Sequence, residues 1–509
     1  MTEPGFYPHG PAKVELRQTH ISYVFLAGEY VYKVKKPVRF AFLDYSTLEK
    51  RRHFCGEELR LNRRLAPKIY LDVVPIGRDG SRFVPEAAHL RAVEYAVKML
   101  CLPEERMLNR LLSEGRAGRE DIRAIVEKLA AFHRSADSAK AAVYGAPEAV
   151  RRQIDENFEE TRSFIGRTIS EKMFHRIRDY SLGFLSAQIG LLEARVRDGR
   201  IKDGHGDLRA EHICMTEDLP IFDCIEFNES FRTCDVASEI GFLAMDLDFL
   251  NAGDLSRYLA AEYARAVGDD ALATLLSLYQ CYRAYVRGKV ESLKSQEREV
   301  PETERERVST AARRYFFLAD RYARGVPRAA LLIVYGLAGS GKSTVARMLG
   351  DLTGFEILSS DVVRKRLARI QPTERAGKGY REGIYSASFT QRTYETLLKE
   401  AEKRLNDGRG LIVDATFNNA EHRRLFLHSA AGMGIRVAFI ECRAGEEEIF
   451  RRLQKRAERN DDISDATWEV YLRQRKEFTP LAEIPDRLHV TIDTESRLGD
   501  SIEEFVESL

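Results

Sequence analysis

A glycine-rich segment that ends in a lysine carries the clearest chemical signal in the chain. Residues 336–344 read GLAGSGKST and match the pattern G-x-x-x-x-G-K-[ST] at every fixed position. The backbone N–H groups of such a loop point at one anion, Lys342 reaches the β- and γ-phosphates, and the Ser343 hydroxyl ligates Mg²⁺. The apolar run before the loop predicts a buried strand, and a helix should begin at Lys342. The pattern therefore predicts an ATP site with Mg²⁺, formed by Gly336, Gly339, Ser340, Gly341, Lys342, Ser343 and Thr344.

Two aspartates lie where later strands are expected to end. Asp361 closes the segment LSSD and has Arg364 one turn further along the following helix, and Asp414 closes the segment LIVD. In a protein with a phosphate loop, a strand-terminal aspartate can act as general base for a substrate hydroxyl or hold Mg²⁺ through its water shell. Each aspartate could instead cap the helix that follows it.

A helix rich in arginine follows these strands. Residues 446–459 read EEEIFRRLQKRAER. The spacing of four and three residues places Arg452, Arg456 and Arg459 on one face of that helix. It could be a lid that presents an arginine to the transferring phosphate, in which case we assign Arg456 to the ATP site, or a surface helix paired by its own charges.

Carboxylates and lysines suited to phosphoryl transfer also occur in the first half of the chain. Asp207 lies in HGDLRAEHI, a polar loop expected to lead into two short strands, and Asp223 ends the second of them. One such aspartate can accept the proton of an attacking hydroxyl while the other holds Mg²⁺ against the phosphates, although HGD also occurs in ordinary turns. Lys33 and Lys35 share one face of an expected strand, so either could point into a cleft or, from an edge strand, into solvent.

The elements that must position these residues follow from the periodicity of the sequence. In the second half, apolar runs alternate with helical stretches, which predicts a parallel sheet wound on both faces with ligands at the carboxyl ends of its strands. Its expected strands are GFEILSSD, GRGLIVDA, IRVAFIEC and RLHVTID. In the first half we expect strands within 21–38, 71–76 and 91–99, and helices within 46–65, 121–133, 150–197 and 254–287.

The two halves are expected to be separate domains. A long helix should end near Arg324, because Gly325 and Pro327 are helix stop signals. We therefore predict independently folding domains at 1–324 and 325–509.

The order of motifs in residues 15–260 resembles the aminoglycoside phosphotransferase family, whose fold is that of protein kinases. The matching segments are VYKVKK, the EEL helix, LAAFH, HGDL with HI, and FD. The resemblance implies a small β-rich lobe followed by a helical lobe. It also implies that Lys33 pairs with the α- and β-phosphates and that Glu58 anchors this lysine, with Lys35 and Glu57 as alternatives.

The same resemblance gives roles to the aspartates. Asp207 matches the catalytic aspartate, Asp223 matches the metal-binding one, and residues 94–108 fall where the family has its adenine-binding hinge. Five residues after the catalytic aspartate the family has an asparagine that holds a second Mg²⁺, and this chain has His212. Neutral imidazole can ligate a metal but is softer than Mg²⁺ prefers, so His212 is the candidate second metal ligand.

Residues 329–495 are similar to the small phosphate-loop kinases that include 5′-hydroxyl polynucleotide kinases, gluconate kinase and zeta-toxin-like kinases. The similarity rests on GLAGSGKST, SSDVVRK, VDATFNNAEHRR and the arginine-bearing helix. It implies a doubly wound α/β kinase domain in which Asp361 is the catalytic base and Arg364 contacts the substrate. Asp414 is then the candidate Mg²⁺ ligand.

The composition argues against several other classes of protein. The chain has 509 residues, of which 44% are hydrophobic and 31% charged, with a formal net charge of +1. This balance implies no bulk attraction to nucleic acid or acidic lipid. The seven cysteines form no C-x-x-C pair, and no apolar run approaches the length of a membrane span. The first ten residues lack the features of a secretory signal, so we expect a cytoplasmic protein without membrane contact.

Together these features predict a bifunctional ATP-dependent phosphotransferase that acts on small-molecule hydroxyls at two sites. One alternative is that only the phosphate-loop half is a kinase and the other half, the N-terminal one because of His212, senses nucleotide. A second alternative is a nucleic-acid 5′-hydroxyl kinase, which the near-zero net charge and the lack of a basic-aromatic stripe disfavour. No motif specifies the acceptor or the oligomeric state.

Overall fold

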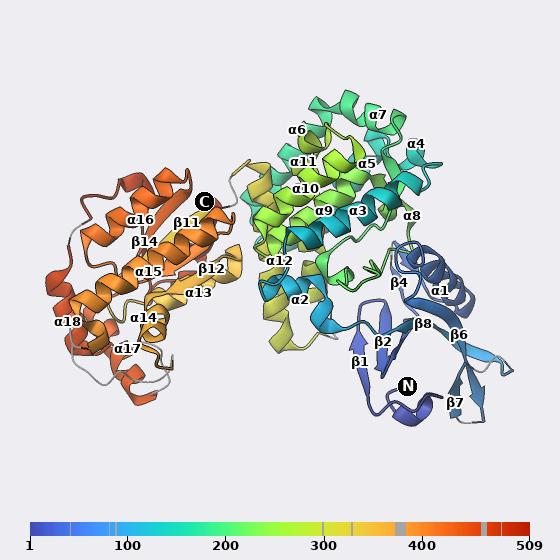
Figure 1. Cartoon of the computed structure of the whole chain (residues 1–509), viewed down its shortest axis with the longest axis horizontal. Helices are drawn as coiled ribbons and strands as arrows, with labels where there is room; N and C mark the ends of the chain where they lie inside the picture. The colour runs from blue at the N-terminus through green and yellow to red at the C-terminus, as the bar shows by residue number, and fades with distance from the viewer. Residues whose placement is uncertain are drawn as a thin grey trace. The chain divides into compact units, whose positions relative to one another are not determined.

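A computed structural model describes residues 1–40, 42–80, 82–86, 89–297, 300–326, 329–371, 383–459, 466–479 and 481–509. The chain divides into two compact units, each described here by itself (Figure 1). The N-terminal unit comprises Met1–Ser163, Ile177–Leu250 and Leu255–Val286. The C-terminal unit comprises Phe164–Arg176, Asn251–Asp254 and Arg287–Leu509.

An antiparallel sheet of six strands dominates the first hundred residues. Its strands lie in the order β1-β2-β3-β8-β6-β7. They are β1 (Val14–Gln18), β2 (Ser22–Ala27), β3 (Tyr30–Lys35), β6 (Tyr70–Asp79), β7 (Arg82–Pro85) and β8 (Ala92–Leu100). The expected hairpin is present, because β2 and β3 pair antiparallel on either side of Gly28, whose φ of 65° suits a tight turn.

The two faces of β3 have different neighbours. Val31 packs in a cluster with Cys55 of helix α1 (Leu48–Asn62), whereas the next residue along the strand packs in a cluster on the opposite face. Since side chains alternate along a strand, Lys33 and Lys35 share the face that α1 covers. The structure therefore settles the alternative left open by the sequence, and neither lysine points from an edge strand into solvent.

Helices form most of the rest of the N-terminal unit. They are α2 (Leu108–Ser113), α3 (Arg119–Ser135), α4 (Ala141–Tyr144), α5 (Pro147–Thr161), α7 (Ile189–Arg197), α8 (Glu229–Arg232) and α9 (Val236–Phe249). Three more contribute residues to both units, namely α6 (Glu171–Ala187), α10 (Gly253–Val267) and α11 (Leu272–Ser295). Two short sheets pair β4 (Arg39–Phe40) with β5 (Leu43–Asp44) and β9 (Ile201–Asp203) with β10 (Thr233–Asp235).

Two local predictions for this unit are wrong. The amphipathic stretch 150–197 is not continuous but is divided into α5, α6 and α7, because a 3₁₀ turn and a loop containing Gly166 at φ 76° interrupt it. The two short strands expected after Asp207 are reduced to one bridge between Ile213 and Ile221.

A parallel sheet of five strands forms the centre of the C-terminal unit and confirms the predicted sheet. Its order is β12-β13-β11-β14-β15. The strands are β11 (Ala330–Tyr335), β12 (Glu356–Ser359), β13 (Leu411–Asp414), β14 (Arg436–Arg443) and β15 (His489–Asp493). The helices are α12 (Glu302–Ala323), α13 (Lys342–Thr353), α14 (Ser360–Ala368), α15 (Ala387–Asn406), α16 (Ala420–Gly432), α17 (Glu446–Arg459), α18 (Trp468–Glu477) and α19 (Leu498–Ser508).

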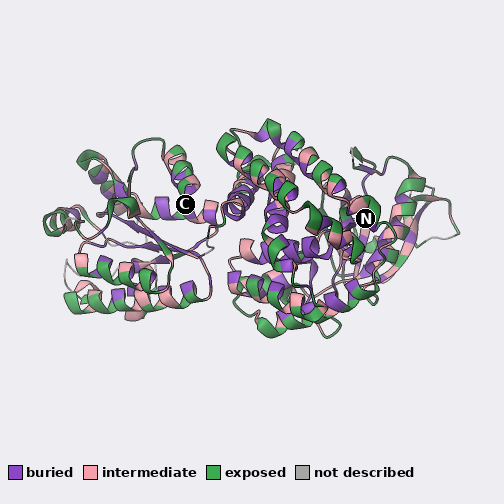
Figure 2. Ribbon diagram, turned by 90° about the horizontal axis from the view of Figure 1, so that it is seen from above, coloured by how far each residue is buried: buried purple, intermediate pink, exposed green. Residues whose placement is uncertain are grey.

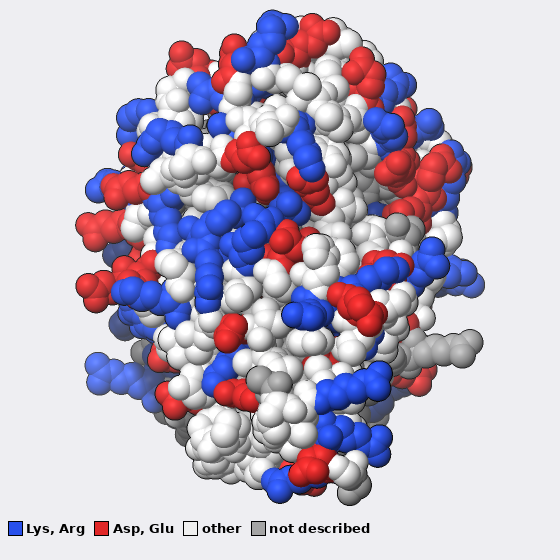
Figure 3. Space-filling view, turned by 90° about the vertical axis from the view of Figure 1, so that its right-hand side faces the viewer, with Lys and Arg blue, Asp and Glu red and all other residues white. Residues whose placement is uncertain are grey.

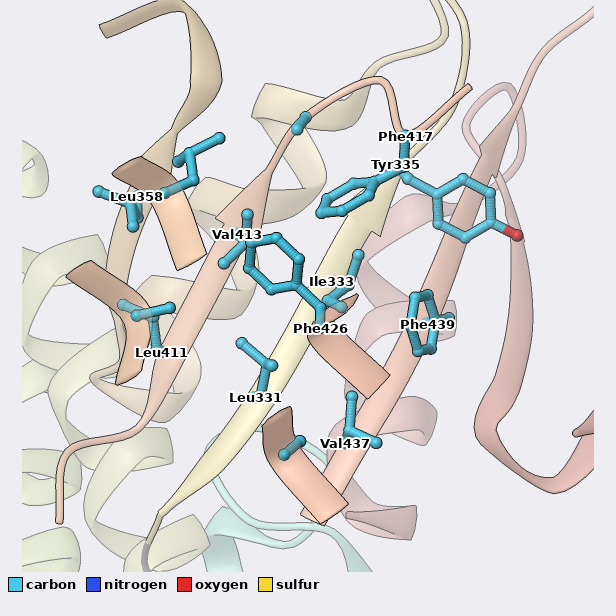
Figure 4. Packing of buried hydrophobic residues seen from close by; sticks show 14 of the residues in the cluster. Leu331, Ile333, Tyr335, Leu358, Leu411, Val413, Phe417, Phe426, Val437 and Phe439 are labelled. Carbon is cyan, nitrogen blue, oxygen red and sulfur yellow. The ribbon is translucent and has the colours of Figure 1, made fainter. Parts of the chain in front are cut away.

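Every residue of β11 is buried, as expected for a central parallel strand. In Figure 2 the strands of the C-terminal unit are drawn mostly in the colour of buried residues. Leu331, Ile333 and Tyr335 pack on one face with side chains of α15 and α16, including Phe426 (Figure 4). The alternate residues of the strand are equally buried on the side of α13. Burial of each such side chain contributes about 1.5–3 kcal/mol, so this strand fixes the loop that follows it.

Helix α12 packs against α13 and belongs to the C-terminal unit. The Arg314 guanidinium fills the space over Gly354, where a Cβ would overlap its nitrogens. The Arg321 guanidinium lies over the ring of Phe355, 5.6 Å from the centroid. The boundary predicted after residue 324 would separate α12 from these partners, and it stays a prediction.

We expect fragment 302–509 to melt several degrees above fragment 325–509. Removing α12 exposes the surface of α13, and each 1 kcal/mol lost lowers the melting temperature of a domain of this size by about 2–4 °C. Circular dichroism melts of the two fragments test this. Equal melting temperatures would show that α12 adds nothing and would support a boundary at Gly325; Pro327, the second stop signal, lies outside the described residues.

Candidate active sites

The phosphate loop of the C-terminal unit depends on glycine at two positions in particular. Gly336 has a φ of 147°, and a Cβ there would lie 2.6 Å from the carbonyl oxygen of Cys442. Gly341 has a φ of 89° and is the N-cap of α13. Only glycine adopts such conformations without strain, so the loop curls at the carboxyl end of β11 and the N-terminus of α13 follows directly.

Lysine and hydroxyl side chains of the loop already have partners. Lys342 Nζ donates to the carbonyl oxygen of Leu337 at 2.8 Å, and Ser343 Oγ donates to Asp414 Oδ2 at 2.8 Å. Burial lowers the pKa of the Lys342 amine, and Asp414 and Asp361 partly offset this effect. Burial likewise raises the pKa of the Asp414 carboxyl, against the opposing effects of Lys342 and the Ser343 hydroxyl. These four side chains therefore form one electrostatic cluster.

Asp361 lies in the first turn of α14, two residues beyond the N-cap, which is Ser359. The prediction that it closes the preceding strand is wrong, because β12 ends at Ser359. It does not cap the helix either. Its carboxylate acts electrostatically on Lys342 and on Asp414. Asp414 does close its strand, as expected, and pairs in register with Val334 of β11.

The remaining predicted residues of the loop have varied surroundings. Ser340 is buried, and its carbonyl oxygen accepts a hydrogen bond from Thr494 Oγ1 at 2.9 Å. A Cβ on Gly339 would lie 2.9 Å from a methyl carbon of Ile449 in α17. Thr344 is exposed in the first turn of α13. Thr494 is a supporting residue that no sequence motif marked.

The arginines of α17 are not equivalent. Arg452 Nε donates to Glu448 at 2.7 Å, and its other nitrogens donate to the side chain and carbonyl of Thr494 at 2.8 and 2.9 Å. Arg456 acts electrostatically on both Lys342 and Asp414. The side chain of Arg459 lies outside the described residues. Arg452 is thus linked to the phosphate loop through Thr494, and Arg456 lies close enough to act on Lys342 and Asp414. The assignment of Arg456 to the ATP site stays a prediction.

Arg364 is buried against the segment that precedes α15. Its Nη1 donates to the carbonyl oxygen of Ile384 at 2.7 Å and to Thr390 Oγ1 at 3.1 Å, and its guanidinium lies 5.0 Å from the centroid of Tyr385. These contacts hold the segment 383–390 in place. Its assignment as a substrate contact stays a prediction.

A second buried arginine, which the sequence reasoning missed, supports the segment after Asp414. Arg423 donates to the carbonyl oxygens of Phe417 at 2.6 Å and Thr479 at 2.9 Å. Phe417 has a φ of 49°, a conformation that costs on the order of 1–3 kcal/mol for a bulky residue. The arginine thus compensates for backbone strain at the carboxyl edge of the sheet. The two adjacent arginines in VDATFNNAEHRR gave no signal for this role.

In the N-terminal unit, Lys33 of β3 meets two carboxylates from distant parts of the chain. Its Nζ lies 2.8 Å from Glu58 Oε1 of α1 and 2.5 Å from Asp223 Oδ1. Burial raises the pKa of the Asp223 carboxyl, but Lys33 and His212 more than offset this and hold it well below its usual range. Asp223 has a φ of 63°, and its N–H donates to the Tyr70 hydroxyl at 3.1 Å. The predicted lysine-glutamate pair is therefore present, and the metal-binding role of the neighbouring Asp223 stays a prediction.

A second lysine lies beside the first and completes a buried network. Lys35 Nζ lies 2.7 Å from Glu58 Oε2 and also contacts Glu226. The Tyr45 hydroxyl donates to the same Glu226 oxygen at 2.5 Å. Burial raises the pKa of Glu58, but Lys33 and Lys35 more than offset this, so the pKa is lowered and the carboxylate stays charged. Lys35 is thus not a substitute for Lys33 but a second partner of Glu58, and Glu57 instead pairs with Arg60 of its own helix.

Asp207 and His212 lie next to this network. Both oxygens of Asp207 accept hydrogen bonds from Arg209, each at 2.9 Å. His212 Nδ1 lies 2.8 Å from the Asp207 carbonyl oxygen, and His212 Nε2 lies 3.6 Å from Asp223 Oδ2. The histidine therefore bridges the two aspartates. Arg209 is another residue that the sequence reasoning missed.

The two donor sets suit Mg²⁺ to different degrees. In the C-terminal unit a hydroxyl oxygen and a carboxylate oxygen face each other at Ser343 and Asp414, which are ligands that Mg²⁺ prefers. In the N-terminal unit Asp223 could supply oxygen, and His212 would supply nitrogen. Among the described residues no group of three or more His, Cys, Asp or Glu side chains could enclose a metal. Mg²⁺ at either site would thus need phosphate and water oxygens as further ligands, as is usual for this ion.

Buried Glu239 fixes the loop that carries Asp207. It accepts the N–H of His205 at 2.8 Å and the N–H of Gly206, and His133 Nε2 lies 3.1 Å away. Burial raises the pKa of Glu239, but the hydrogen bond and charge of His133 more than offset this and lower it to about 2. A carboxylate whose pKa is lowered on folding stabilises the protein above its unfolded pKa, about 4.3, and loses this contribution as the pH falls toward 2.

We expect Glu239→Gln to destabilise the N-terminal unit by about 2–4 kcal/mol at pH 7, because the loop N–H groups lose a charged acceptor. The difference in unfolding free energy between the variant and the parent protein should become smaller as the pH falls from about 5 toward 2. Urea unfolding monitored by circular dichroism at several pH values measures both effects, with exposed Glu217→Gln as the matched control. A constant difference across this pH range would contradict the assignment.

Comparisons with known proteins give matches to the C-terminal unit and to most of the chain. The model of a family described as an AAA domain matches residues 331–481. An uncharacterized protein of Mycobacterium tuberculosis is 32% identical over 459 residues, which is 90% of this chain and 88% of that protein, and an uncharacterized protein of Mycobacterium bovis matches equally. A UPF0200 protein of Aeropyrum pernix is 32% identical over 151 residues, which is 28% of this chain and 72% of that protein.

Two solved structures illustrate the structural matches. The APS kinase of Mycobacterium tuberculosis in complex with AMPPNP and APS is 23% identical, covers 36% of this chain and 97% of its own, and has a TM-score of 0.26. A gluconokinase of Sinorhizobium meliloti is 15% identical, covers 35% of this chain and 91% of its own, and also has a TM-score of 0.26. No helix in the described part of this chain is long and apolar enough to cross a membrane.

Proposed function

The chain belongs to the family of the mycobacterial proteins that align with 90% of its length, and we propose that it is an ATP-dependent phosphotransferase with one nucleotide site in each unit. The C-terminal unit is the phosphate-loop kinase of this proposal. The N-terminal unit is a kinase with the fold of the aminoglycoside phosphotransferases. In each unit the acceptor is the hydroxyl of a small molecule.

One observation carries the proposal for both units. A lysine meets carboxylates that are far away in the sequence: Lys342 interacts with Asp414, and Lys33 pairs with Asp223, 190 residues along the chain. Phosphoryl transfer requires a lysine that neutralises phosphate oxygens. It also requires nearby carboxylates, one to accept a proton and one to bind a metal ion. In the C-terminal unit, a purely structural ion pair would not need the glycine-built loop beside it.

In the C-terminal unit, the loop N–H groups and Lys342 hold the β- and γ-phosphates. Asp361 accepts the proton of the acceptor hydroxyl while the oxygen bonds to the γ-phosphorus. The bond from that phosphorus to the β,γ-bridging oxygen breaks, and ADP leaves with the electron pair. Arg456 supplies positive charge to the transferring group, and Mg²⁺, when bound, neutralises charge on the phosphates.

In the N-terminal unit, Glu58 holds Lys33 in position for the α- and β-phosphates. Asp207 accepts the proton of the acceptor hydroxyl, and the same bond in ATP breaks. Arg209 takes up one lone pair on each oxygen of Asp207, and a second lone pair on each oxygen is left with which the carboxylate can accept that proton.

The experiment separates the two sites within the full chain. Lys342→Ala removes the charge on the β- and γ-phosphates in the C-terminal unit, and Asp207→Asn removes the base in the N-terminal unit. We would measure ADP formation by each single variant and by the double variant against a library of sugars, polyols and other alcohols. If the proposal is right, ADP formation with some acceptors should be lost in only one of the two single variants. ADP formation by the double variant equal to that of the parent would refute it.

A second candidate function has its own support. The bidentate Arg209 contact occupies both oxygens of Asp207, so the N-terminal unit could bind nucleotide without transferring phosphate. It would then report nucleotide to the C-terminal unit. ATP binding to the Lys342→Ala protein with no turnover of any acceptor would favour this candidate.

Transfer to nucleic acid is a weaker candidate. On the face shown in Figure 3, basic side chains gather in one area, but acidic side chains border it and are interspersed elsewhere. Binding of a single strand requires a continuous basic groove with aromatic platforms. A salt-dependent mobility shift with a 5′-hydroxyl oligonucleotide would revive this candidate.

The presence of His212 leads to a prediction about the metal preference of the N-terminal site. If its imidazole ligates the metal, activity of the N-terminal site should favour Mn²⁺ over Mg²⁺ more strongly than an amide ligand would allow, because nitrogen is a softer donor than oxygen. His212→Asn should keep the reaction and shift the preference toward Mg²⁺. Turnover in Mn²⁺ and in Mg²⁺, compared between the two proteins in the Lys342→Ala background, checks this. An unchanged ratio would mean that His212 only bridges the aspartates.

A further inference from the structure

Four phenylalanines of the N-terminal unit form a cluster that no step so far uses. Phe40 and Phe42 are stacked, with ring centroids 5.7 Å apart and planes 15° apart. Phe42 lies 5.9 Å from Phe227 and 6.2 Å from Phe231. Phe227 and Phe231 are 6.4 Å apart at 89°. We refer to these four residues as the aromatic cluster.

Much of the aromatic cluster is open to solvent. Phe40 and Phe42 are each 42% exposed and Phe231 is 37% exposed, whereas Leu43 of the same hairpin is buried. A core contact would bury these rings, and isolated surface phenylalanines would not gather in one place. Several exposed aromatic side chains that contact one another mark a surface that gains from binding an apolar group.

Backbone hydrogen bonds place one side of the aromatic cluster beside the catalytic loop. The Ile225 N–H donates to the carbonyl oxygen of His205 at 3.0 Å, and the Gly204 N–H donates to the carbonyl oxygen of Arg232 at 2.9 Å. Both ends of the intervening loop, which carries two of the phenylalanines, are therefore attached within three residues of Asp207.

Two further contacts bring the other side of the cluster to the same place. A Cβ on Gly206 would lie 3.1 Å from the carbonyl oxygen of Phe231, so the catalytic loop packs directly on that residue. The Tyr45 hydroxyl donates to Glu226 at 2.5 Å, which ties the end of the hairpin that carries Phe42 to the start of the phenylalanine-bearing loop. The aromatic cluster thus joins two segments that both belong to the candidate site.

We propose that the aromatic cluster binds the acceptor of the N-terminal site and that this acceptor is an alcohol with an aromatic ring near its hydroxyl. The proposal deepens, and rests on, the phosphotransferase function assigned to this unit. Phenylalanine rings offer no hydrogen bonds, and they interact best with another ring in offset-stacked or edge-to-face geometry. The charged groups of this loop already have partners: Glu226 pairs with Lys35, Glu229 with Lys140 at 2.5 Å, and Arg232 with Asp203 at 2.7 Å. A polycationic sugar would therefore gain little from this surface.

The test uses the full chain with Lys342→Ala, so that only the N-terminal site turns over. The probe is 2-(2-naphthyl)ethanol, and 2-cyclohexylethanol is the comparison alcohol without an aromatic ring. Phe42→Leu and Phe231→Leu keep an apolar side chain but remove a ring. Phe83→Leu is the matched control, because Phe83 is 52% exposed on β7 and is not part of the cluster. Binding is measured by saturation-transfer NMR, and transfer is measured as ADP formation.

We expect Phe42→Leu and Phe231→Leu each to raise the Kd and KM of the naphthyl alcohol by about 3- to 10-fold, as expected for the loss of one aromatic contact. The KM for ATP and the Kd of the cyclohexyl alcohol should change little, and Phe83→Leu should change nothing. Equal Kd values for the naphthyl alcohol in all variants would overturn the proposal. The proposal would also be overturned if the probe did not bind and Phe42→Leu changed the oligomeric state. The aromatic cluster would then be a contact between copies of the protein.

The two levels of the proposal fail differently. Cluster-dependent binding of the naphthyl alcohol without any transfer would support ring recognition and refute the phosphotransferase function of this unit. Transfer to alcohols that does not depend on the cluster would support the function and overturn the aromatic acceptor.

Discussion

The Asp361→Asn protein is expected to bind ATP as the parent does and to transfer phosphate from the C-terminal site about 10²–10⁴-fold more slowly, the loss typical of a missing general base. Asparagine is similar in shape but cannot accept the proton of the acceptor hydroxyl. Asp361 is not needed to cap α14, since the N-cap is Ser359. The change should therefore leave the fold intact. Steady-state turnover in the Asp207→Asn background measures the effect on this site alone.

Asp351→Asn is the matched control, because it makes the same change at an exposed position of α13. ATP affinity measured by calorimetry should be unchanged in both variants. If Asp361→Asn turns over at the parent rate, the base lies elsewhere. Asp414 is then the next candidate, because its burial raises the pKa of its carboxyl and favours proton uptake.

The C-terminal site could be predicted well because its chemistry is nearly contiguous. The loop from Gly336 to Thr344 lies between one buried strand and one helix, so the sequence itself sets the geometry of the phosphate cradle. The position of Asp414 followed from the rule that ligands gather at the carboxyl ends of parallel strands. The assignment of Arg456 rather than Arg452 to the ATP site had no support in the spacing, because helical periodicity places both on one face and the hydrogen bonds of Arg452 to Thr494 appear only in the structure.

The N-terminal site shows what residue spacing alone leaves out. Lys33 and Glu58 could be paired by the order of motifs, but Lys35 was only an alternative to its neighbour. Its partner Glu226 lies 191 residues away, and no local pattern predicts such a contact. Arg209 was missed for a related reason: two residues after Asp207, an arginine can as easily point to solvent. The break between α5 and α6 was hidden because the apolar periodicity resumes after the loop at Gly166.

The Asp207→Asn protein is expected to lose transfer from the N-terminal site by about 10²–10⁴-fold, in the parent and in the His212→Asn background alike. The amide cannot accept the acceptor proton, and His212 faces the backbone carbonyl of Asp207 rather than open space, so it is not placed to act as the base instead. The measurement is turnover in the Lys342→Ala background, where the C-terminal site is silent.

Because Asp207 also pairs with Arg209, the substitution must be separated from a loss of folding. The amide that replaces the carboxylate could accept a hydrogen bond at only one oxygen, so we expect a modest loss of stability, about 1–3 kcal/mol, that thermal melting would detect. Arg209→Gln should show a similar loss of stability while keeping Asp207 as a free base, and Asp218→Asn, at an exposed position, controls for the chemical change. Transfer that survives in Arg209→Gln and vanishes in Asp207→Asn identifies the carboxylate as the base. If no variant transfers phosphate but ATP still binds, the N-terminal unit is a nucleotide sensor. Full transfer by the Asp207→Asn protein would contradict both accounts, because Asp223, the other carboxylate nearby, is held by Lys33.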